Sequence, residues 1–424
     1  MTATTVSPGT PGIAATQRRV LRVLVASQVL SGAGLSAGVT VGALLAQDML
    51  GGAGLAGLPS ALFTAGSALA AVVVGRLSQA RGRRPGLALG YLAAVVGSAG
   101  IIVAAVAGSA ILLFPAMFLY GAGTAANLQA RYAGADLASR SHRGRAVSTV
   151  LVATTVGGVV GPNLAAPAGD LAHALGIPHL AGPFLLSGVA YALAAVALTC
   201  WLRPDPLLLA RSLAEPTVEP TVEPAAESAA EPAAEPALAE AGRGSVVVGA
   251  FVMVVAQLVM VSIMTMTPIH MHDHGLGTAA SGLVIAVHVA AMYLPSPVTG
   301  WLVDRFGTRA TTAASAATLL AAGIVAATAP GDSIVMLSVA LGLLGLGWNL
   351  GLVSGTAIVT DALPLETRAK TQGLVDVCIA LAGAAGGISS GVVVETAGYA
   401  VLANVGGLLA LALLPVIAVG AVRR

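Results

Sequence analysis

The sequence predicts an all-α integral membrane protein in which twelve transmembrane helices form two six-helix bundles. Three observations support this fold class. The composition is too apolar for a water-soluble surface, twelve apolar stretches are long enough to cross a bilayer, and the two halves of the chain repeat one another.

The composition excludes most soluble classes of protein. Of the 424 residues, 57% are hydrophobic and 9% are charged, and the mean hydropathy is +0.91. Soluble domains carry about 25% charged residues, so this chain cannot cover a water-facing surface of its size. We therefore expect neither a soluble enzyme nor a nucleic-acid-binding protein. Two cysteines without metal-site spacing, Cys200 and Cys378, indicate no disulfide framework or redox site.

Apolar stretches divide the chain into two sets of six. A helix needs about 20 apolar residues to cross a bilayer. The predicted spans are 20–45, 58–77, 86–107, 109–128, 146–168 and 181–201, followed by 245–269, 278–302, 310–329, 333–360, 371–394 and 399–422. The predicted domains are therefore a disordered tail (1–19), a first bundle (20–202), a linker (203–244) and a second bundle (245–424). The linker holds seven Glu residues interleaved with Pro and Ala, a composition typical of a solvated spacer.

The basic residues predict the orientation. All 20 Lys and Arg residues fall in the N-terminal tail, in alternate loops, in the linker or at the C-terminus. Because cytoplasmic loops carry the excess of Lys and Arg, both termini are expected in the cytoplasm. We predict a multi-pass protein of a bacterial cytoplasmic (inner) membrane, in contact with the lipid bilayer and monomeric.

The two halves repeat at an offset of 225 residues. This offset places Gly75–Arg84 on Gly300–Arg309, where two Gly, one Leu and one Arg coincide. The same offset aligns Asp136 with Asp361 and Arg143 with Arg368. A duplicated six-helix unit is the organisation of many secondary transporters.

The repeated loop resembles a family signature. The pattern G-x-L-x-D-R-x-G-R-[KR], carried by Gly300–Arg309, is similar to that of the major facilitator superfamily, although Gln79 replaces the acidic residue in the first copy. The resemblance covers essentially the whole chain and implies two six-helix bundles around a central cavity. We expect a cytoplasmic latch formed by Gly300, Asp304, Arg305, Gly307, Arg309, Asp136 and Asp361. Because Gln79 lacks the acidic group, the latch at the first copy of the motif is expected to be weaker or to be supplied by other residues.

Charged residues inside the predicted spans are scarce. Asp376 lies inside the eleventh span, where burying a carboxylate is costly. It is therefore a candidate for coupling transport to an ion, the alternative being a hydrated or helix-capping side chain. Arg131, at the end of the fourth span, is expected to anchor the following loop through Asp136.

The seventh and eighth spans hold an unusual set of soft ligands. Met260 and Met264 are four residues apart, as are His288 and Met292, so each pair shares a helix face. Thioethers with an imidazole suit Cu(I), whereas ordinary core packing is the alternative for the methionines. The combination of M-x3-M with H-x3-M also resembles the CcoA-like copper importers of the superfamily. That resemblance implies that these four residues bind copper as the transported substrate, and no cofactor is expected.

Histidines cluster where the seventh span is expected to leave the membrane on the outer side. His270 and His272 are candidates for capturing copper at the outer mouth, the alternative being hydrated interfacial side chains. The sequence therefore predicts copper import by alternating access.

Two other functions compete with copper import. The fifth span contains G-x3-G-P from Gly157 to Pro162, which resembles part of the antiporter motif of drug/proton exporters but also suits a bent, close-packed helix. A proton-coupled multidrug or small-molecule exporter is therefore the alternative. A membrane-bound copper sensor is a weaker candidate, because the duplicated halves favour transport. We find no nucleophile–base pattern or phosphate-binding loop, so an enzyme is not expected.

Overall fold

The computed structural model describes residues 11–50, 58–214 and 234–415, which form helices and short connections with no strand among them. The first half contains α1 (Pro11–Leu50), α2 (Leu58–Arg81), α3 (Arg83–Ala107), α4 (Ala110–Tyr120), α5 (Ala122–Ala135), α6 (Arg143–Ala174), α7 (Gly182–Trp201) and α8 (Pro206–Ala214). The second half contains α9 (Ala234–Asp273), α10 (Thr278–Tyr293), α11 (Ser296–Thr328), α12 (Ile334–Ala362), α13 (Arg368–Ala397) and α14 (Tyr399–Leu409).

The predicted spans fall on these helices, with two differences. The fourth span is divided between α4 and α5 at Gly121, and α11 combines the end of the eighth span with the ninth across a break at Gly307. Eight described helices are long and apolar enough to cross a membrane, or nine if the bent pair Arg140–Gly158 and Asn163–Ala174 forms one span. Twelve crossings therefore remain a prediction.

The domain boundaries differ in detail from those predicted. Helix α1 begins at Pro11, so residues 11–19 are helical rather than part of a tail. Helix α8 and the first eleven residues of α9 fall within the range predicted as linker. The rest of the acidic segment, residues 215–233, lies outside the described residues, as do 1–10 and 416–424.

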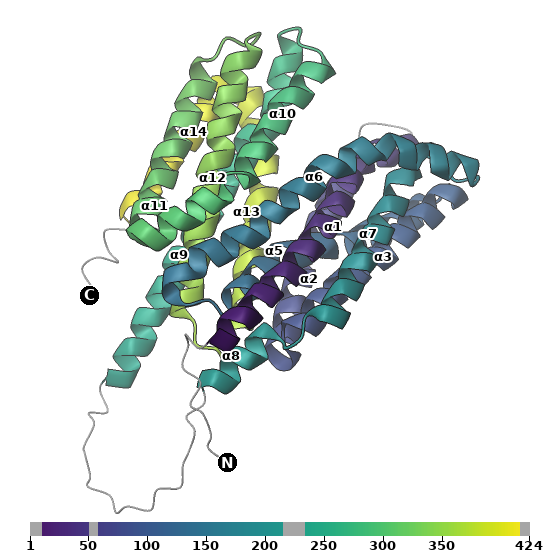
Figure 1. Cartoon of the computed structure of the whole chain (residues 1–424). Coiled ribbons are helices and arrows are strands. Elements are labelled where there is room, and N and C mark those ends of the chain that lie inside the picture. The colour runs from purple at the N-terminus through teal and green to yellow at the C-terminus, as the bar shows by residue number, and fades with distance from the viewer. Residues whose placement is uncertain (1–10, 51–57, 215–233, 416–424) are drawn as a thin grey trace, which may run out of the picture.

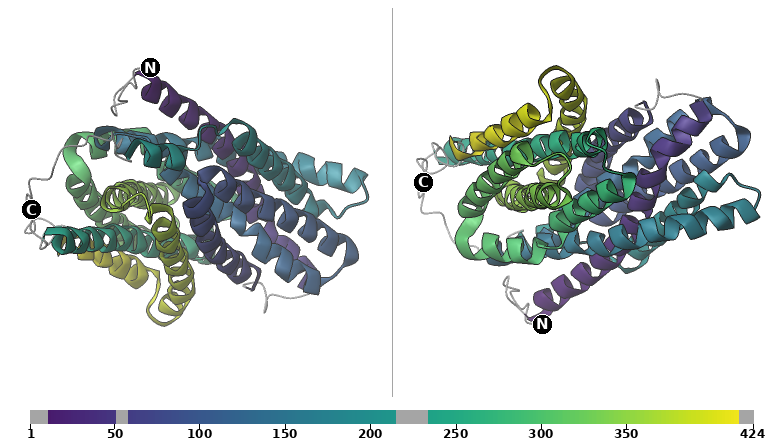
Figure 2. Two further views of the ribbon diagram at one scale, coloured as in Figure 1. Left: turned by 90° about the horizontal axis from the view of Figure 1, so that it is seen from below. Right: turned by 90° about the horizontal axis from the view of Figure 1, so that it is seen from above.

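Buried apolar side chains form two clusters: one lies in the first half, and the other lies mainly in the second half but includes Ala135, Val147 and Leu151 of the first. One contains Leu24, Tyr91 and Leu198, and the other contains Val259 and Leu344. Large apolar side chains on the outer faces are exposed instead, in keeping with contact to lipid; Val96 is 59% exposed and Ile388 is 74% exposed. Figure 2 shows the two groups of helices lying side by side.

The two groups of helices approach each other most closely at one end of the molecule and diverge toward the other (Figure 1). We call the closed end the arginine-rich end, because the segments 76–84, 131–145, 305–309 and 368–370 meet there. The hydrogen bonds and ion pairs seen between the halves gather at this end. The structure is therefore sealed at the arginine-rich end.

A buried polar network joins four helices of the first half. The Tyr91 hydroxyl donates to Gln28 Oε1 at 2.9 Å and lies 3.1 Å from Ser31 Oγ. Asn127 Nδ2 donates to Ser31 Oγ at 2.8 Å, and Gln28 Nε2 donates to Thr154 Oγ1 at 3.2 Å. Since all these groups are buried, each needs its partner in the network.

We predict that Tyr91→Phe lowers stability by about 1–3 kcal/mol, because Gln28 Oε1 loses a donor in a buried site. The thermal melting of the purified protein in detergent measures this. Tyr191→Phe is the matched control, since the buried Tyr191 hydroxyl makes no hydrogen bond within the described residues. Equal melting temperatures for the two variants would contradict the prediction.

Candidate functional site

The seam at the arginine-rich end repeats the sequence offset in three dimensions. Helix α2 crosses α13 at Gly75, where a Cβ would stand 2.9 Å from the carbonyl oxygen of Ala369. Helix α11 crosses α6 at Gly300, where a Cβ would stand 2.5 Å from the carbonyl oxygen of Gly144. The two crossings correspond under the offset of 225 residues: Gly75 corresponds to Gly300, and Ala369 corresponds to Gly144. Glycine is needed at both positions because the two backbones touch.

Each repeated loop also accepts hydrogen bonds from the first turn of a helix in the other half. Asp304 Oδ1 accepts the Gly144 N–H at 2.8 Å, and Oδ2 accepts the Arg145 N–H at 3.1 Å. Gln79 Oε1 occupies the equivalent place and accepts the Ala369 N–H at 2.7 Å. Its Nε2 donates to the carbonyl oxygens of Leu365, at 3.1 Å, and Glu366. An amide in place of the acid therefore still joins the halves, without a charge.

The other predicted latch residues lie on the same seam. Asp361 pairs with Arg143, and Asp136 Oδ1 lies 3.9 Å from Arg368 Nη1, so these two contacts are again related by the offset. Gly307 has φ 84° and ψ 165°, and Gly82 has φ 94° and ψ 168°, a conformation that favours glycine. Arg305 and Arg309 are exposed on the loop that follows Asp304.

One buried ion pair breaks the symmetry of the seam. Arg131 Nη2 on α5 lies 2.7 Å from Asp376 Oδ1 on α13, and both side chains are buried. Arg131 Nε donates to Thr356 Oγ1 at 3.0 Å, and the Tyr132 hydroxyl lies 3.3 Å from Asp376 Oδ1. The expectation that Arg131 anchors its loop through Asp136 is therefore wrong. Its carboxylate partner is on the opposite half of the molecule.

Asp136 instead pairs with a different arginine. Arg83 Nε donates to Asp136 Oδ2 at 2.7 Å, and Arg83 Nη2 donates to Gln372 Oε1 at 2.5 Å across the seam. The sequence reasoning missed Arg83 because it was treated as one of several loop charges. The available signal was its position: Arg83 lies two residues after Arg81 and three residues before the predicted span 86–107, and the structure starts α3 at this residue.

An aromatic and amide cluster lies farther inside the second half. Trp348 Nε1 on α12 donates to Gln257 Oε1 on α9 at 2.7 Å. The Tyr293 ring on α10 packs edge-on against Trp348, with 5.7 Å between the ring centroids. The three residues lie 14 to 16 residues from the ends of their helices opposite the arginine-rich end, which is about 20–25 Å along each axis. They are therefore at one depth.

The cluster lies within electrostatic reach of the first half. Gln257 and Tyr293 are half-buried, and Tyr293 lies close enough to Arg131 of the first half to interact electrostatically. Gln257 Nε2 faces α13 at Gly383, because a Cβ added to Gly383 would stand 3.1 Å from this nitrogen. The sequence reasoning missed these residues because it considered only charged, His and Met side chains within spans. A Trp and a Gln in mid-span were the overlooked signals.

The predicted copper ligands are buried within the second half. Met260 and Met292 are buried, Met264 is half-buried, and His288 is 0% exposed. Helices α9 and α10 each pack along α12 and touch each other only briefly. His288 turns toward α12, where its Nδ1 lies 2.8 Å from the Leu341 carbonyl oxygen. Its Nε2 is buried and has no hydrogen-bond partner in the described part of the chain.

The predicted outer-mouth residues do not form a pair. His270 stacks on Tyr399 at 4.2 Å between ring centroids, and its nearest imidazole is that of His274, at 4.3 Å. His272 is exposed two residues along the same helix, so it points away from this pair. Among the described residues, no three His, Cys, Asp or Glu side chains are arranged to hold a metal ion.

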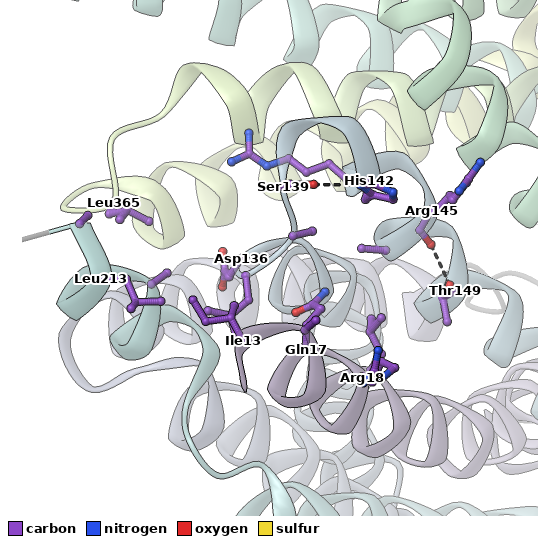
Figure 3. Close-up of a pocket in the computed structure, with 18 of the residues that line it drawn as sticks. Ile13, Gln17, Arg18, Asp136, Ser139, His142, Arg145, Thr149, Leu213 and Leu365 are labelled. Atoms are coloured by element: carbon purple, nitrogen blue, oxygen red, sulfur yellow. Dashed lines mark hydrogen bonds between the residues drawn. The ribbon is translucent and has the colours of Figure 1, made fainter. Parts of the chain in front are cut away.

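A cavity of about 700 Å³ opens at the arginine-rich end (Figure 3). Its walls come from the first turns of α1 and α6, the connection between α5 and α6, the end of α8 and the connection between α12 and α13. They include Ile13, Gln17, Arg18, Asp136, Ser139, His142, Arg145, Thr149, Leu213 and Leu365. The cavity holds none of the predicted copper ligands. Because it borders both halves, its shape depends on how the seam is closed.

Comparison with known proteins identifies the family. The sequence model of the Major Facilitator Superfamily matches residues 24–292 and 249–423. The chain belongs to the major facilitator superfamily. It is therefore a membrane transporter of the type that acts on small molecules, and the transporters of this family are generally not enzymes. The likeness to copper importers suggested by the Met and His pattern finds no support in these matches.

Individual relatives cover nearly the whole chain. The uncharacterized MFS-type transporter YdeG of Bacillus subtilis is 54% identical over 400 residues, which cover 94% of this chain and 91% of the relative. The riboflavin transporter RfnT of Brucella anthropi is 30% identical over 363 residues, which cover 85% of each. The human organic anion transporter MFSD10 has a similar fold, with a TM-score of 0.74 at 17% identity over 95% of this chain and 99% of that chain.

We predict that Asp304→Ala opens the arginine-rich end. The change removes the acceptor for two N–H groups at the start of α6, worth about 1–2 kcal/mol, so the open-to-closed ratio should rise about 5- to 30-fold. Spin labels at exposed positions 141 and 305 report the separation of α6 and α11 in nanodiscs.

Asp170→Asn, which changes an exposed carboxylate at the opposite end of α6, is the control and should leave the distances unchanged. An unchanged distance distribution in Asp304→Ala would contradict a latch at this position.

Proposed function

We propose that this protein is a secondary active transporter that carries a planar, aromatic organic solute by alternating access. The arginine-rich end is then the cytoplasmic face of a bacterial inner membrane, because loops rich in Arg face the cytoplasm. The described structure corresponds to a state closed on that side. The repeated loops, with Asp304 and Gln79 capping helices of the opposite half, serve as the cytoplasmic latch.

The Trp348, Gln257 and Tyr293 cluster carries the proposal for the solute. An indole and a phenol at one depth offer a stacking surface, and a half-buried amide offers hydrogen bonds to the edge of a flat heterocycle. The Trp348–Gln257 hydrogen bond orients the amide before the solute arrives. Such a site favours ring systems that carry both carbonyl and N–H groups.

The riboflavin transporter of Brucella anthropi supports this class of solute. A flavin is a planar heterocycle with carbonyl and N–H groups on one edge, which matches the stacking and amide groups of the cluster. At 30% identity over 85% of the chain, the relationship makes riboflavin the first solute to test.

We predict that Gln257→Leu and Trp348→Phe each reduce uptake of radiolabelled riboflavin about tenfold. Each change removes one member of the orienting hydrogen bond in a desolvated site, a loss of about 1.4 kcal/mol. Initial rates in cells that depend on external riboflavin measure the effect, with membrane protein levels matched.

Trp301→Phe is the matched control for riboflavin uptake. Trp301 is 42% exposed and packs against Phe306, away from the cluster, so this variant should transport as the wild type does. If the wild type neither transports riboflavin nor is inhibited by other planar heterocycles, the proposed solute class is wrong.

Copper import is a second candidate because of one observation on His288. With Nδ1 donating to the Leu341 carbonyl oxygen, the lone pair of Nε2 is left without a partner among the described residues, which is how a metal-binding histidine is oriented. In this alternative, Met260, Met264 and Met292 supply thioethers, and His270 and His272 collect copper at the outer mouth.

For copper import, we predict that copper-limited cells expressing the wild type accumulate copper and that His288→Ala and Met264→Ala do not. The measurement is cell-associated copper, with Met336→Ala, in the first turn of α12, as a control methionine outside the proposed ligand set. Equal accumulation in all strains would assign the Met and His residues to core packing.

A further inference from the structure

The cavity at the arginine-rich end has walls from both halves of the molecule. The first half supplies Gln17 and Arg18 of α1, and the second half supplies Leu365 of the connection between α12 and α13 (Figure 3). When the halves separate, these walls move apart. A ligand that contacts both walls therefore binds the closed state and stabilises it. The volume of about 700 Å³ is in the range that holds small organic molecules.

Helix α8 forms a third wall and is fastened to both halves. Arg211 Nη2 donates to the carbonyl oxygen of Gln79 at 2.9 Å and to that of Leu365 at 3.2 Å. Because Gln79 belongs to the first half and Leu365 to the second, this guanidinium group bridges the seam. The same helix places Ala210 and Leu213 against the cavity. The cavity therefore has its full set of walls only while the seam is closed.

The charged groups in and around the cavity carry an excess of positive charge. The charged residues of the lining are Arg18, Arg143, Arg145, Arg368 and Asp136. The charged groups that act on these five from outside the lining are Arg83, Arg140, Asp304, Asp361 and Glu366. Six guanidinium groups therefore stand against four carboxylates, which leaves two positive charges uncompensated within this set. Guanidinium groups held close together repel one another, and an anion between them removes that repulsion.

Two residues of the lining each hold a buried polar atom that has no hydrogen-bond partner among the described residues. Gln17 Nε2 donates to the Gly134 carbonyl oxygen at 2.7 Å, which leaves Oε1 as an unused acceptor. Arg143 pairs with Asp361 through Nη1, which leaves Nε as an unused donor. Because buried polar groups are normally hydrogen-bonded, an acceptor and a donor left over beside one cavity indicate contacts for a ligand.

Aliphatic side chains form much of the remaining wall. They are Ile13, Leu21, Leu137, Leu213 and Leu365. A bare inorganic ion would leave them in contact with water, whereas an organic body covers them. Guanidinium groups bind phosphate oxygens through pairs of parallel hydrogen bonds. The lining therefore suits a phosphate group attached to an apolar or aromatic body.

We propose that this cavity binds a phosphate ester with an apolar body from the cytoplasmic side, and that the bound ester holds the arginine-rich end closed. The phosphate contacts the arginines, and the body covers the aliphatic wall. Because the ester touches both halves and α8, it must leave before the halves separate, so transport slows as its concentration rises. The proposal rests on the proposed alternating access and orientation but not on the identity of the solute.

Flavin mononucleotide is a suitable probe, because it joins a phosphate group to a flat ring system and is fluorescent. Its binding is titrated with the full chain in phosphatidylcholine nanodiscs. Arg18→Glu reverses one charge of the lining and should weaken binding at least about tenfold. Arg19→Glu is the matched control, since Arg19 is exposed on the same helix, does not line the cavity and gives the same net charge. Absence of saturable binding to the wild type, or equal affinities in the two variants, would overturn the proposal.

A cavity-filling variant keeps the site testable if Arg18→Glu does not insert into the membrane. Ala210 lines the cavity from α8, so the indole of Ala210→Trp occupies the space of the ligand and should abolish binding of the probe. Wild-type affinity in this variant would place the probe elsewhere and overturn the proposal.

The effect on the seam is measured with spin labels at exposed positions 76 and 370 on α2 and α13, in a chain with Cys200 and Cys378 replaced by Ser. At ten times its Kd for the wild type, flavin mononucleotide should lower the open-to-closed ratio about tenfold. The same concentration should lower the ratio of Arg18→Glu by about twofold or less, because binding is weaker. An unchanged or increased ratio with the probe bound to the wild type would overturn the role in closure.

A soluble phosphate ester and a phospholipid headgroup share the proposed chemistry, so the titration is repeated in nanodiscs that contain phosphatidylglycerol. Loss of probe binding there identifies the lipid as the occupant, whereas unchanged affinity identifies a soluble ester. If riboflavin uptake fails while binding of the probe still depends on Arg18, the proposed solute is overturned and the cavity site stands.

Discussion

The N–H groups in the first turns of α6 and α13 obtain their acceptors from the opposite half of the molecule, and the closed state depends on this. A helix leaves four N–H groups without partners in its first turn. Here Asp304 satisfies two of them on α6, and Gln79 bonds the Ala369 N–H on α13. Water can take over the same bonds when the halves separate, so closure costs little to reverse. The close glycine crossings beside each cap make the closed arrangement specific.

The charges on the seam determine how much each contact contributes. Asp304 brings a negative charge to the positive end of a helix, whereas Gln79 brings none and compensates by donating to two carbonyl oxygens. Arg131 and Asp376 differ from both, because they are buried and the repeat supplies no counterpart. A contact with one exposed partner, such as the half-exposed Arg145 beside Asp304, exchanges with water more easily, but the buried pair separates only if its charges are first compensated.

Sequence patterns predicted the features that do not depend on how the two halves pack against each other. Apolar length located the helices, and the offset between the halves located the loops that meet on the seam. The partner of Arg131 could not be predicted, because Asp136 is near in sequence whereas Asp376 becomes near only when the halves face each other. Likewise, four-residue spacing correctly placed His288 and Met292 on one face of α10, but that face packs on α12. Periodicity identifies a helix face and not the neighbour that covers it.

The Trp348, Gln257 and Tyr293 cluster lies within electrostatic reach of the buried ion pair, which connects the state of one to that of the other. Tyr293 interacts with Trp348 on one side and lies near Arg131 on the other. In the proposed function, a solute that stacks on this surface changes the polarity of the surroundings of Arg131, which is fully buried, and the interactions of a buried cation respond strongly to such a change. An empty site and an occupied site therefore impose different energies on the Arg131–Asp376 pair. A transporter that opens its two sides in turn needs such a difference at the point where its two halves meet.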